Sequence, residues 1–381
     1  MPLNFITCGE SHGKYLAVIV EGMPSGLPVD LSVVNHELWR RQQGFGRGGR
    51  QKIEKDQVEI LGGVVAGKTT GASVGFLLTN KDFKIDKMPE LLRPRPGHAD
   101  LAGALKYDQG IRPVLERASA RETAMRVAVG ALAKLLLREF GIEIVSHVVR
   151  IGSVCVDDVG ARHALPLQSV SEIKRRTADS QMNCAYPEIE TRMIQLIKET
   201  IQKRDSLGGQ YEVRVAGLPI GLGSHVHWKR KLDGRLARGL MSMQSVKAVE
   251  MGLGTRAGSI FGSEAHDEIF YTKEKGYYRK TDRAGGVEGG MTNGADLLCR
   301  VTVKPISTLM RPLASVNMKT KKPEQAEYER SDICVVPAAS VIGEAIVAYE
   351  TADAFLEKFG GDSIQEIGRN WQGYLEQVKR S

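Results

Sequence analysis

Apolar residues recur at every third or fourth position over several long stretches of this chain. The clearest stretch covers residues 119–140, and its spacing predicts a helix with one apolar face. Ser119 followed three residues later by Glu122 predicts a capping box at its start, and Gly141 supplies a stop signal. We predict further helices over residues 31–41, 187–203 and 340–359.

Shorter apolar runs, rich in β-branched residues and bounded by turn residues, predict strands. They cover residues 58–61, 72–78, 142–149, 211–215 and 297–303.

Two distant segments also share the pattern strand, G-x-P-x-G-L, helix: Gly22–Leu27 and Gly217–Leu222. Glycine and proline are common in turns, so chance can give such a match, but the spacing favours two related halves of one architecture. We therefore predict one α+β domain covering residues 1–381, with mobile glycine-rich loops near residues 40–51 and 262–294.

Two phosphate-binding patterns occur in the wrong structural context. Gly62–Thr69 matches G-x-x-x-x-G-K-[ST], but a strand rather than a helix is predicted to follow it, so we expect a hairpin there. Gly44-x-Gly46-x-x-Gly49 matches the dinucleotide fingerprint, but it follows a predicted helix. We therefore expect neither a P-loop nucleotidase nor a Rossmann dehydrogenase.

The chain has 381 residues and a net charge of +8. Such a surplus fits nucleic acid, an anionic membrane surface or a small polyanionic substrate. The five cysteines lack C-x-x-C spacing, which predicts buried apolar residues in a reducing compartment and no metal site. The N-terminus lacks a signal-peptide pattern and no apolar run is long enough for a membrane span, so we expect a cytoplasmic protein.

Arginine and glycine dominate the segment from Arg40 to Arg50, which has four of each and no acid. Arginine holds phosphate or carboxylate in a bidentate fork, and glycine lets the backbone approach a ligand closely. The segment therefore predicts a cationic loop that binds an anion.

Other segments gather titratable groups near turns. Gly9–Gly13 carries His12, which could transfer a proton or simply occupy a turn. Residues 93–100 display arginines, His98 and an aspartate from a proline-stiffened backbone, typical of a pre-organised site or of a charged surface loop. Residues 117–123 place two arginines at the start of the best helix, where an anion would bind, although Ser119 could be a simple cap.

Two more segments carry charged or hydroxyl groups beside apolar, strand-like runs. Lys304–Thr308 places a lysine and two hydroxyl groups at the end of a predicted strand, a common place for ligand contacts. Residues 330–332 put an arginine and Asp332 beside an apolar stretch. This pair could be a salt bridge, or the aspartate could be a base held next to a cofactor.

These segments, in this order, resemble the chorismate synthase family, whose members catalyse the last step of the shikimate pathway. The resemblance covers nearly the whole chain. The matching motifs are G-E-S-H-G at 9–13, R-R-Q-x-G-x-G-R at 40–47, R-P-G-H-A-D at 95–100, R-x-S-A-R-E-T-A-M-R-V-A-x-G-A at 117–131, G-G-M-T-N-G at 289–294, K-P-I-S-T at 304–308 and R-S-D at 330–332. Seven motifs in one order make a chance match implausible.

The resemblance implies an anti-1,4-elimination of phosphate from 5-enolpyruvylshikimate-3-phosphate, giving chorismate. It also implies a requirement for reduced FMN without net oxidation, because the flavin is thought to lend an electron that weakens the carbon–oxygen bond and to recover it afterwards. The implied fold is a β-α-β sandwich with internal pseudo-symmetry. A substrate with a phosphate and two carboxylates, together with the FMN phosphate, explains the need for many arginines.

Residue roles follow from the same resemblance. His12 would protonate the departing phosphate, His98 would lie near the flavin pyrimidine ring, and Asp332 would act as a base toward the flavin's central-ring nitrogen. Substrate would be bound by Ser11, Arg41, Arg47, Arg50, Arg95, Ala120, Arg121 and Arg330. FMN would be bound by Arg117, Ala118, Ser119, Gln244, Ser245, Gly289, Lys304, Pro305, Ile306, Ser307, Thr308 and Arg330.

The chain departs from the family pattern at Ala118, where serine is frequent, and at Gln244-Ser245, where asparagine-alanine is usual. Neither change removes an ionisable catalytic group. The resemblance further implies a homotetramer and a separate flavin reductase, with NADPH involved only indirectly although family annotation associates Arg41 and Arg47 with it. It implies neither a nucleic-acid partner nor a membrane.

The alternative is a basic RNA-binding protein that uses Arg40–Arg50 as an RGG-type segment. Such proteins interleave aromatic residues for base stacking. Only 6% of the residues are aromatic, and Phe45 is the one aromatic residue in this segment. The composition therefore favours the enzyme.

Overall fold

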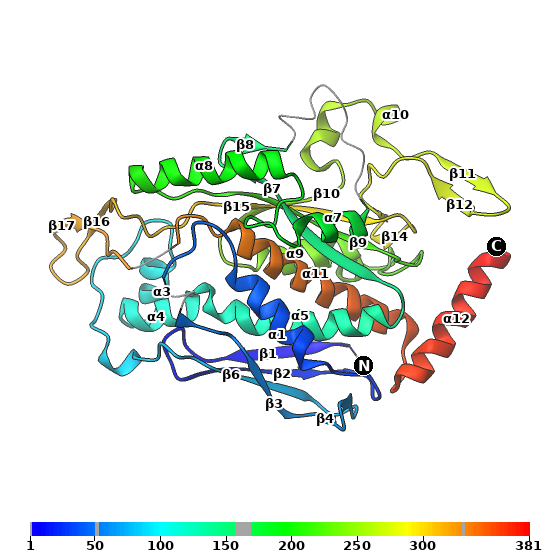
Figure 1. Cartoon of the computed structure of the whole chain (residues 1–381), viewed down its shortest axis with the longest axis horizontal. Coiled ribbons are helices and arrows are strands. Elements are labelled where there is room, and N and C mark those ends of the chain that lie inside the picture. The colour runs from blue at the N-terminus through cyan, green and yellow to red at the C-terminus, as the bar shows by residue number, and fades with distance from the viewer. Residues whose placement is uncertain (1, 50–52, 157–168, 330–331) are drawn as a thin grey trace.

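Two antiparallel sheets enclose a layer of helices (Figure 1). The computed structural model describes residues 2–49, 53–156, 169–329 and 332–381. The first sheet has the strand order β1-β2-β6-β3 and the second the order β10-β15-β9-β7-β8. Their strands are β1 (Asn4–Cys8), β2 (Tyr15–Glu21), β3 (Val58–Gly62), β6 (Val74–Thr79), β7 (Glu143–Ile151), β8 (Val154–Cys155), β9 (Gly209–Ala216), β10 (Val246–Met251) and β15 (Leu297–Val303).

The layer between the sheets consists of α1 (Leu31–Gln42), α5 (Thr123–Arg138), α9 (Leu232–Met241) and α11 (Val336–Phe359). One cluster of buried apolar residues includes side chains from both sheets and from these helices. The helices α5 and α11 cross in close contact, since a Cβ atom at Gly130 would lie within 2.4 Å of the Ala345 backbone. The two sheets and these helices form the predicted β-α-β sandwich.

The remaining elements lie outside this core or connect it. The helices are α3 (Asp100–Tyr107), α4 (Ile111–Ala118), α7 (Val170–Thr177), α8 (Pro187–Lys203), α10 (Gly262–Ala265) and α12 (Ile364–Arg380), with short 3₁₀ turns at Ile85–Lys87, Ala120–Glu122, Trp228–Arg230 and Gly254–Ser259. Small hairpins are formed by β4 (Val64–Val65) with β5 (Lys68–Thr69), β11 (Ile269–Thr272) with β12 (Gly276–Arg279), β13 (Val287–Glu288) with β14 (Met291–Thr292), and β16 (Ala314–Val316) with β17 (Pro323–Gln325). Length and hydropathy rule out a membrane crossing for every helix in the described part of the chain.

The internal pseudo-symmetry is visible in the order of the elements. The first half runs β1, β2, α1, β3, β6, α5, and the second runs β7, β9, α9, β10, β15, α11. The corresponding strands lie in the same order, β1-β2-β6-β3 and β7-β9-β15-β10. The glycines of the repeated G-x-P-x-G-L segment also match, with φ of 86° and 85° at Gly22 and Gly26 and of 81° and 88° at Gly217 and Gly221. Since these values favour glycine, the repeat reflects a shared turn.

The pseudo-symmetry explains the misleading P-loop pattern. Thr69 Oγ1 donates to the Pro24 carbonyl, and Thr292 Oγ1 donates to the Pro219 carbonyl at the corresponding place in the second half. The residues around the two threonines correspond as well, reading G-K-T-T-G-A-S at 67–73 and G-M-T-N-G-A-D at 290–296. As predicted, residues 64–69 form a hairpin, β4–β5.

The helix predicted over residues 119–140 is wrong at its start. The helix α4 ends at Ala118, residues 120–122 form a 3₁₀ turn, and α5 begins at Thr123. Ser119 Oγ accepts from the Arg121 amide at 3.3 Å, and the Glu122 carboxylate bonds to side chains outside the turn, so the predicted capping box does not form. Tertiary contacts to this turn override its local helical preference.

Four of the five cysteines are buried as predicted, and all five are free thiols. The exception is Cys8, which is exposed. It ends the edge strand β1 with its side chain on the outer face of the first sheet. The alternation of the strand thus places this apolar side chain outward.

A buried ionic network ties the central helices to the second sheet. The Arg40 guanidinium donates two hydrogen bonds of 3.0 Å to Glu344, and Lys134 contacts both Glu344 and Glu37. The Ser146 hydroxyl donates to Glu344 at 2.7 Å. The nearby cations and their hydrogen bonds hold the pKa of Glu344 below its ordinary value although burial opposes this. Arg40 therefore stabilises the core, whereas the side chain of the next residue, Arg41, takes part in a different network.

Candidate active site

Three arginines from two distant segments share one buried cluster, Arg41 and Arg47 from the first and Arg121 from the second. The Arg121 guanidinium donates to Asp56 Oδ2 at 2.7 Å, and Arg41 NH1 lies 3.6 Å from the same oxygen. Burial lowers the pKa of Arg41 to about 9, and the charges of Arg121 and Arg47 also lower it, whereas Asp56 and Asp332 raise it. The Arg121 side chain is buried and points into this cluster instead of toward solvent. The cluster therefore gathers three guanidinium groups, which can hold phosphate or carboxylate, beside the carboxylates of Asp56, Asp332 and Glu54.

The α1 residue Arg41 is also held by the turn that breaks the predicted helix. Its Nε donates to Thr123 Oγ1 at 3.0 Å, and its NH2 donates to the Ala120 carbonyl at 2.8 Å. The 3₁₀ turn at residues 120–122 therefore presents a carbonyl group that a continuous helix would have used internally. Ala120 contributes through its backbone.

Asn80 connects the arginine cluster to the His12 turn. The Asn80 carbonyl oxygen accepts hydrogen bonds from Arg121 Nε and NH2, and the Asn80 amide donates to the Gly13 carbonyl at 2.7 Å. Ser119 Oγ donates to Ser11 Oγ at 3.1 Å. His12, Ser11, Ser119 and Arg121 therefore lie in one connected network, as the motifs predicted.

Asp332 also belongs to the arginine cluster, through its contacts with the glycine-rich segment. Its Oδ2 lies 3.4 Å from Arg47 Nε, and its Oδ1 accepts a short hydrogen bond of 2.5 Å from the Gly48 amide. The Ile333 amide donates to the Gly46 carbonyl at 2.8 Å, so the two backbones run side by side. The glycine-rich segment thus binds Asp332 directly.

His98 belongs to a second network, centred on Asp100. The Asp100 carboxylate lies 2.5 Å from His98 Nδ1 and accepts from Arg95 Nε at 2.8 Å. Arg95 NH1 donates to Thr308 Oγ1 at 2.9 Å. Although burial opposes it, the hydrogen bonds from His98 and Arg95 hold the pKa of Asp100 well below its ordinary value. Asp100 therefore orients both of these predicted site residues.

The predicted strand-end segment extends this second network. The Lys304 ammonium and the Ser307 hydroxyl both donate to the Gly97 carbonyl, next to His98. The Lys304 amide donates to the Ser245 carbonyl at 2.9 Å, and Ser245 has a φ of +70°. Burial, and then the charge of Lys247, lower the pKa of Lys304. Two FMN segments predicted from distant parts of the chain are thus adjacent.

One chain segment runs between the two networks. Glu327 accepts from Arg93 NH2 at 2.6 Å, near Arg95, and Glu329 accepts from Arg112 NH2 at 3.0 Å. Arg112 NH1 in turn lies 3.9 Å from Glu116 Oε1, so this segment contacts both the surroundings of Arg95 and those of His12.

Some predicted site residues lie apart from these networks or outside the described residues. Gly289 connects β13 to β14 before the start of β15, whereas Lys304 follows the end of β15. Arg117, by contrast, lies beside the His12 turn, since it donates to the carbonyls of Thr7 in β1 and of Gly9 just after it. Arg50 and Arg330 lie outside the described residues.

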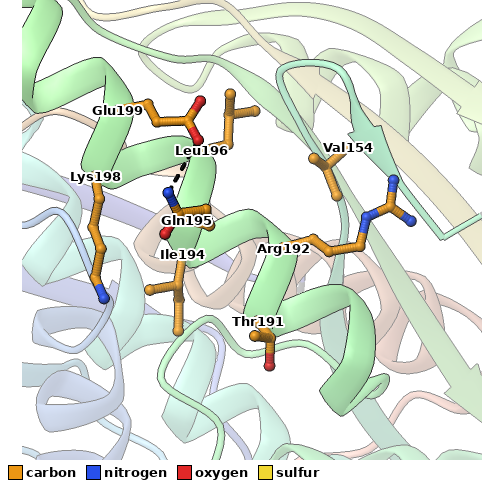
Figure 2. A pocket seen from close by; sticks show the side chains of 8 residues that line it. All are labelled: Val154, Thr191, Arg192, Ile194, Gln195, Leu196, Lys198 and Glu199. Carbon is orange, nitrogen blue, oxygen red and sulfur yellow. Dashed lines mark hydrogen bonds between the residues drawn. The ribbon is translucent and has the colours of Figure 1, made fainter.

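The described part of the chain lines several cavities, and two of them bear on where the site lies. One of about 550 Å³ runs along α8 beside Val154 of β8, and Figure 2 shows its side chains. Its lining in the described part of the chain is separate from both networks. The other, of about 420 Å³, adjoins the His12 turn and is bordered by Glu10, Glu116 and Arg117.

Several residues of the networks were not singled out from the sequence. The predicted site residues are held by Asp56, Asn80, Glu116 and Thr123. Of these, Thr123 lies in a motif that the sequence analysis discussed, and the other three do not. Asn80 follows a strand-like apolar run, and a polar residue at a strand end was the available signal. Glu116 and Asp56 gave no local signal, because their partners are distant in the sequence.

Known proteins that are similar to this chain belong to one family. Residues 3–356 match the family model described as chorismate synthase. The chorismate synthase of Solibacter usitatus is 51% identical over 99% of each chain, and that of Alkaliphilus metalliredigens is 50% identical over 97% of this chain and 99% of its own. A solved structure titled "Crystal Structure of Chorismate Synthase" superposes with a TM-score of 0.83 at 41% identity, covering 100% of this chain and 99% of the other. This chain belongs to the chorismate synthase family.

Proposed function

We propose that the two networks bind 5-enolpyruvylshikimate-3-phosphate and reduced FMN side by side, and that the chain releases phosphate from the former to give chorismate. The observation that carries the proposal is the convergence of Arg41, Arg47 and Arg121 with Asp332 and the His12 network. Several guanidinium groups fixed in one place suit a ligand with several anionic groups. Nothing in the described part of the site resembles the aromatic stacking surface of an RNA-binding protein.

The residues of the second network fit a flavin. Lys304 and the hydroxyl groups of Ser307 and Thr308 offer donors for a phosphate or a ring carbonyl. The Gln244 side-chain oxygen is buried without a hydrogen-bond partner among the described residues, which suits an acceptor for a ring N–H group. When bound, reduced FMN supplies reversible electron donation.

Within this site we assign the proton transfers to side chains of the chain itself. His12 would donate a proton to the departing phosphate, and Asp332 would accept a proton at a carboxylate oxygen. His98, whose ring is held by Asp100, would balance the charge of a bound flavin. Arg41, Arg47, Arg95 and Arg121 offset the negative charges of the substrate, together with Arg50 and Arg330.

The decisive test of this function is the dependence of phosphate release on the redox state of the flavin. Under anaerobic conditions with dithionite-reduced FMN, the protein is expected to release phosphate and form chorismate, while oxidised FMN supports no turnover. The measurement is the rate of phosphate and chorismate formation in each state. Equal rates with both forms, or release of phosphate without chorismate, would contradict the proposal.

Substitution Arg47→Ala is expected to weaken substrate binding by roughly 10- to 100-fold, because a hydrogen bond to a charged group contributes about 1.5–3 kcal/mol. FMN binding is expected to change by less than about threefold, since Arg47 lies in the first network. Equilibrium titration with each ligand measures both effects. Arg238→Ala, at an exposed arginine, is the matched control, and a larger loss for FMN than for substrate would show the assignment to be wrong.

Further features of this family are proposals for this chain. We propose that it acts as one domain, supported by the apolar cluster shared between the sheets. We also propose a homotetramer, a cytoplasmic location and a separate flavin reductase. Mobility of the loops near residues 40–51 and 262–294 stays a prediction.

A further inference from the structure

Glu116 holds the His12 turn at three points. It lies in the last turn of α4, and its side chain is only 1% exposed. Its Oε2 accepts from the His12 backbone amide at 2.7 Å, its Oε1 lies 2.9 Å from His12 Nδ1, and its backbone carbonyl accepts from the Ser11 amide at 2.9 Å. One buried residue therefore fixes both the backbone and the ring of His12 across 104 positions of the chain.

The charge of Glu116 decides where the imidazole proton resides. Burial opposes ionisation, but the hydrogen bonds from His12 and the charge of Arg112 hold the pKa of Glu116 below its ordinary value. The carboxylate is therefore ionised at neutral pH and can only accept hydrogen bonds. A neutral imidazole with its lone pair on Nδ1 would face this carboxylate and be repelled, so the proton occupies Nδ1.

We propose that Glu116 is the positioning residue for His12, which fixes the Nδ1–H tautomer and leaves Nε2 as the atom that exchanges a proton with the substrate phosphate. The arrangement follows the same logic as the aspartate that orients the histidine of a serine protease. The proposal rests on the proposed role of His12 as the proton donor. Glu116 itself touches no reacting atom.

The charge of Glu116 also stabilises the protonated imidazole. Other charged groups near His12 in the described part of the chain are Glu10 on its own turn, Arg112 and Arg117 on α4, and Lys84, whose amide donates to the His12 carbonyl. Arg112 NH1 lies 3.9 Å from Glu116 Oε1, so it offsets only part of the carboxylate charge. Loss of this carboxylate therefore disfavours the charged ring.

The test is Glu116→Gln, which keeps the size and hydrogen bonding of the side chain but removes its charge. We expect kcat to fall roughly 10- to 100-fold, with the KM for substrate changed by less than about threefold. The basic limb of the kcat–pH profile is expected to move to lower pH by at least about one unit, because an opposite charge at this distance favours the protonated ring. Glu116→Asp keeps the charge and should return the limb toward its wild-type position.

The outcomes separate this proposal from the role of His12. If His12→Ala is slow while Glu116→Gln has the wild-type rate and pH profile, the positioning role is overturned and the role of His12 stands. If His12→Ala has the wild-type rate, the proposed role of His12 itself is wrong.

In the double variant His12→Ala/Glu116→Gln, we expect no loss of kcat beyond that of His12→Ala alone, and a multiplicative loss would overturn the proposal. Glu350→Gln is the matched control at a buried carboxylate on α11, far along the chain from the His12 turn.

A measurement on the unaltered protein covers the case in which Glu116→Gln does not fold. With ¹⁵N-labelled histidine, ring nitrogen shifts report the tautomer of each neutral histidine, and the His12→Ala spectrum identifies the His12 signals among the eight histidines. We expect the proton of neutral His12 on Nδ1. A proton on Nε2 would overturn the proposal.

Discussion

Substitution His12→Ala is expected to lower kcat by roughly 100- to 10,000-fold, which is the usual contribution of a positioned general acid. The departing phosphate carries its full charge unless a proton reaches it, and in the proposed function His12 supplies this proton from the network that holds its turn. Anaerobic turnover with reduced FMN gives the rate. Substrate and FMN affinities are expected to change far less, because the arginines remain.

The pH dependence of this variant gives a second check. Phosphate monoesters take up a proton near pH 6, so the substrate itself becomes a better leaving group as the pH falls. The rate of His12→Ala relative to wild type should therefore rise as the pH is lowered from about 8 to about 6. His36→Ala, at an exposed histidine on α1, is the matched control. A deficit that stays constant with pH would contradict protonation of phosphate by His12.

Substitution Asp332→Asn is expected to lower kcat by roughly 10- to 1,000-fold, because an amide keeps the shape of the side chain but cannot take up a proton. The side-chain carbonyl of the introduced asparagine can still accept from the Gly48 amide, so the glycine-rich segment keeps its contact. Single-turnover measurement separates this loss from slow product release. Wild-type turnover would remove the assigned role.

The ionic contact with Arg47 provides the control for this variant. Asp332→Asn also removes the partner of Arg47, 3.4 Å away, which frees that arginine for the substrate. Substrate binding should therefore stay the same or tighten while kcat falls. Weaker substrate binding would indicate that Asp332 is structural. Asp362→Asn, at an exposed aspartate before α12, is the matched control.

Patterns that repeat locally made the regular elements predictable. The bounds of the helix over Pro187–Lys203 and the strand over Leu297–Val303 agree with the sequence, because proline marks the helix start and the strand run ends at Lys304-Pro305. The G-x-P-x-G-L repeat indicated the pseudo-symmetry for the same reason, since its glycines are needed for the shared turn. The second repeat, at 67–73 and 290–296, is also visible in the sequence, and its first copy overlaps the P-loop-like pattern that the predicted hairpin excluded.

Features that depend on contacts between residues distant in the sequence could not be predicted. The turn at residues 120–122 breaks a strongly helical pattern, because the Ala120 carbonyl is needed by Arg41. The buried position of Arg121 depends on Asp56 and Asn80, which come from other segments. The motifs predicted most of the titratable groups of the candidate site. The residues that orient these groups, such as Asp56, Asn80 and Glu116, could be identified only from the structure.

The buried arginines have a consequence for the stability of the polypeptide by itself. Arg41 lies in the interior beside Arg121 and Arg47, and its lowered pKa reflects its burial and then the repulsion from these two charges. The carboxylates of Asp56, Asp332 and Glu54 oppose this repulsion within the chain. We expect an anionic ligand at this cluster to stabilise the folded chain further, because burial still holds the pKa of Arg41 below its ordinary value.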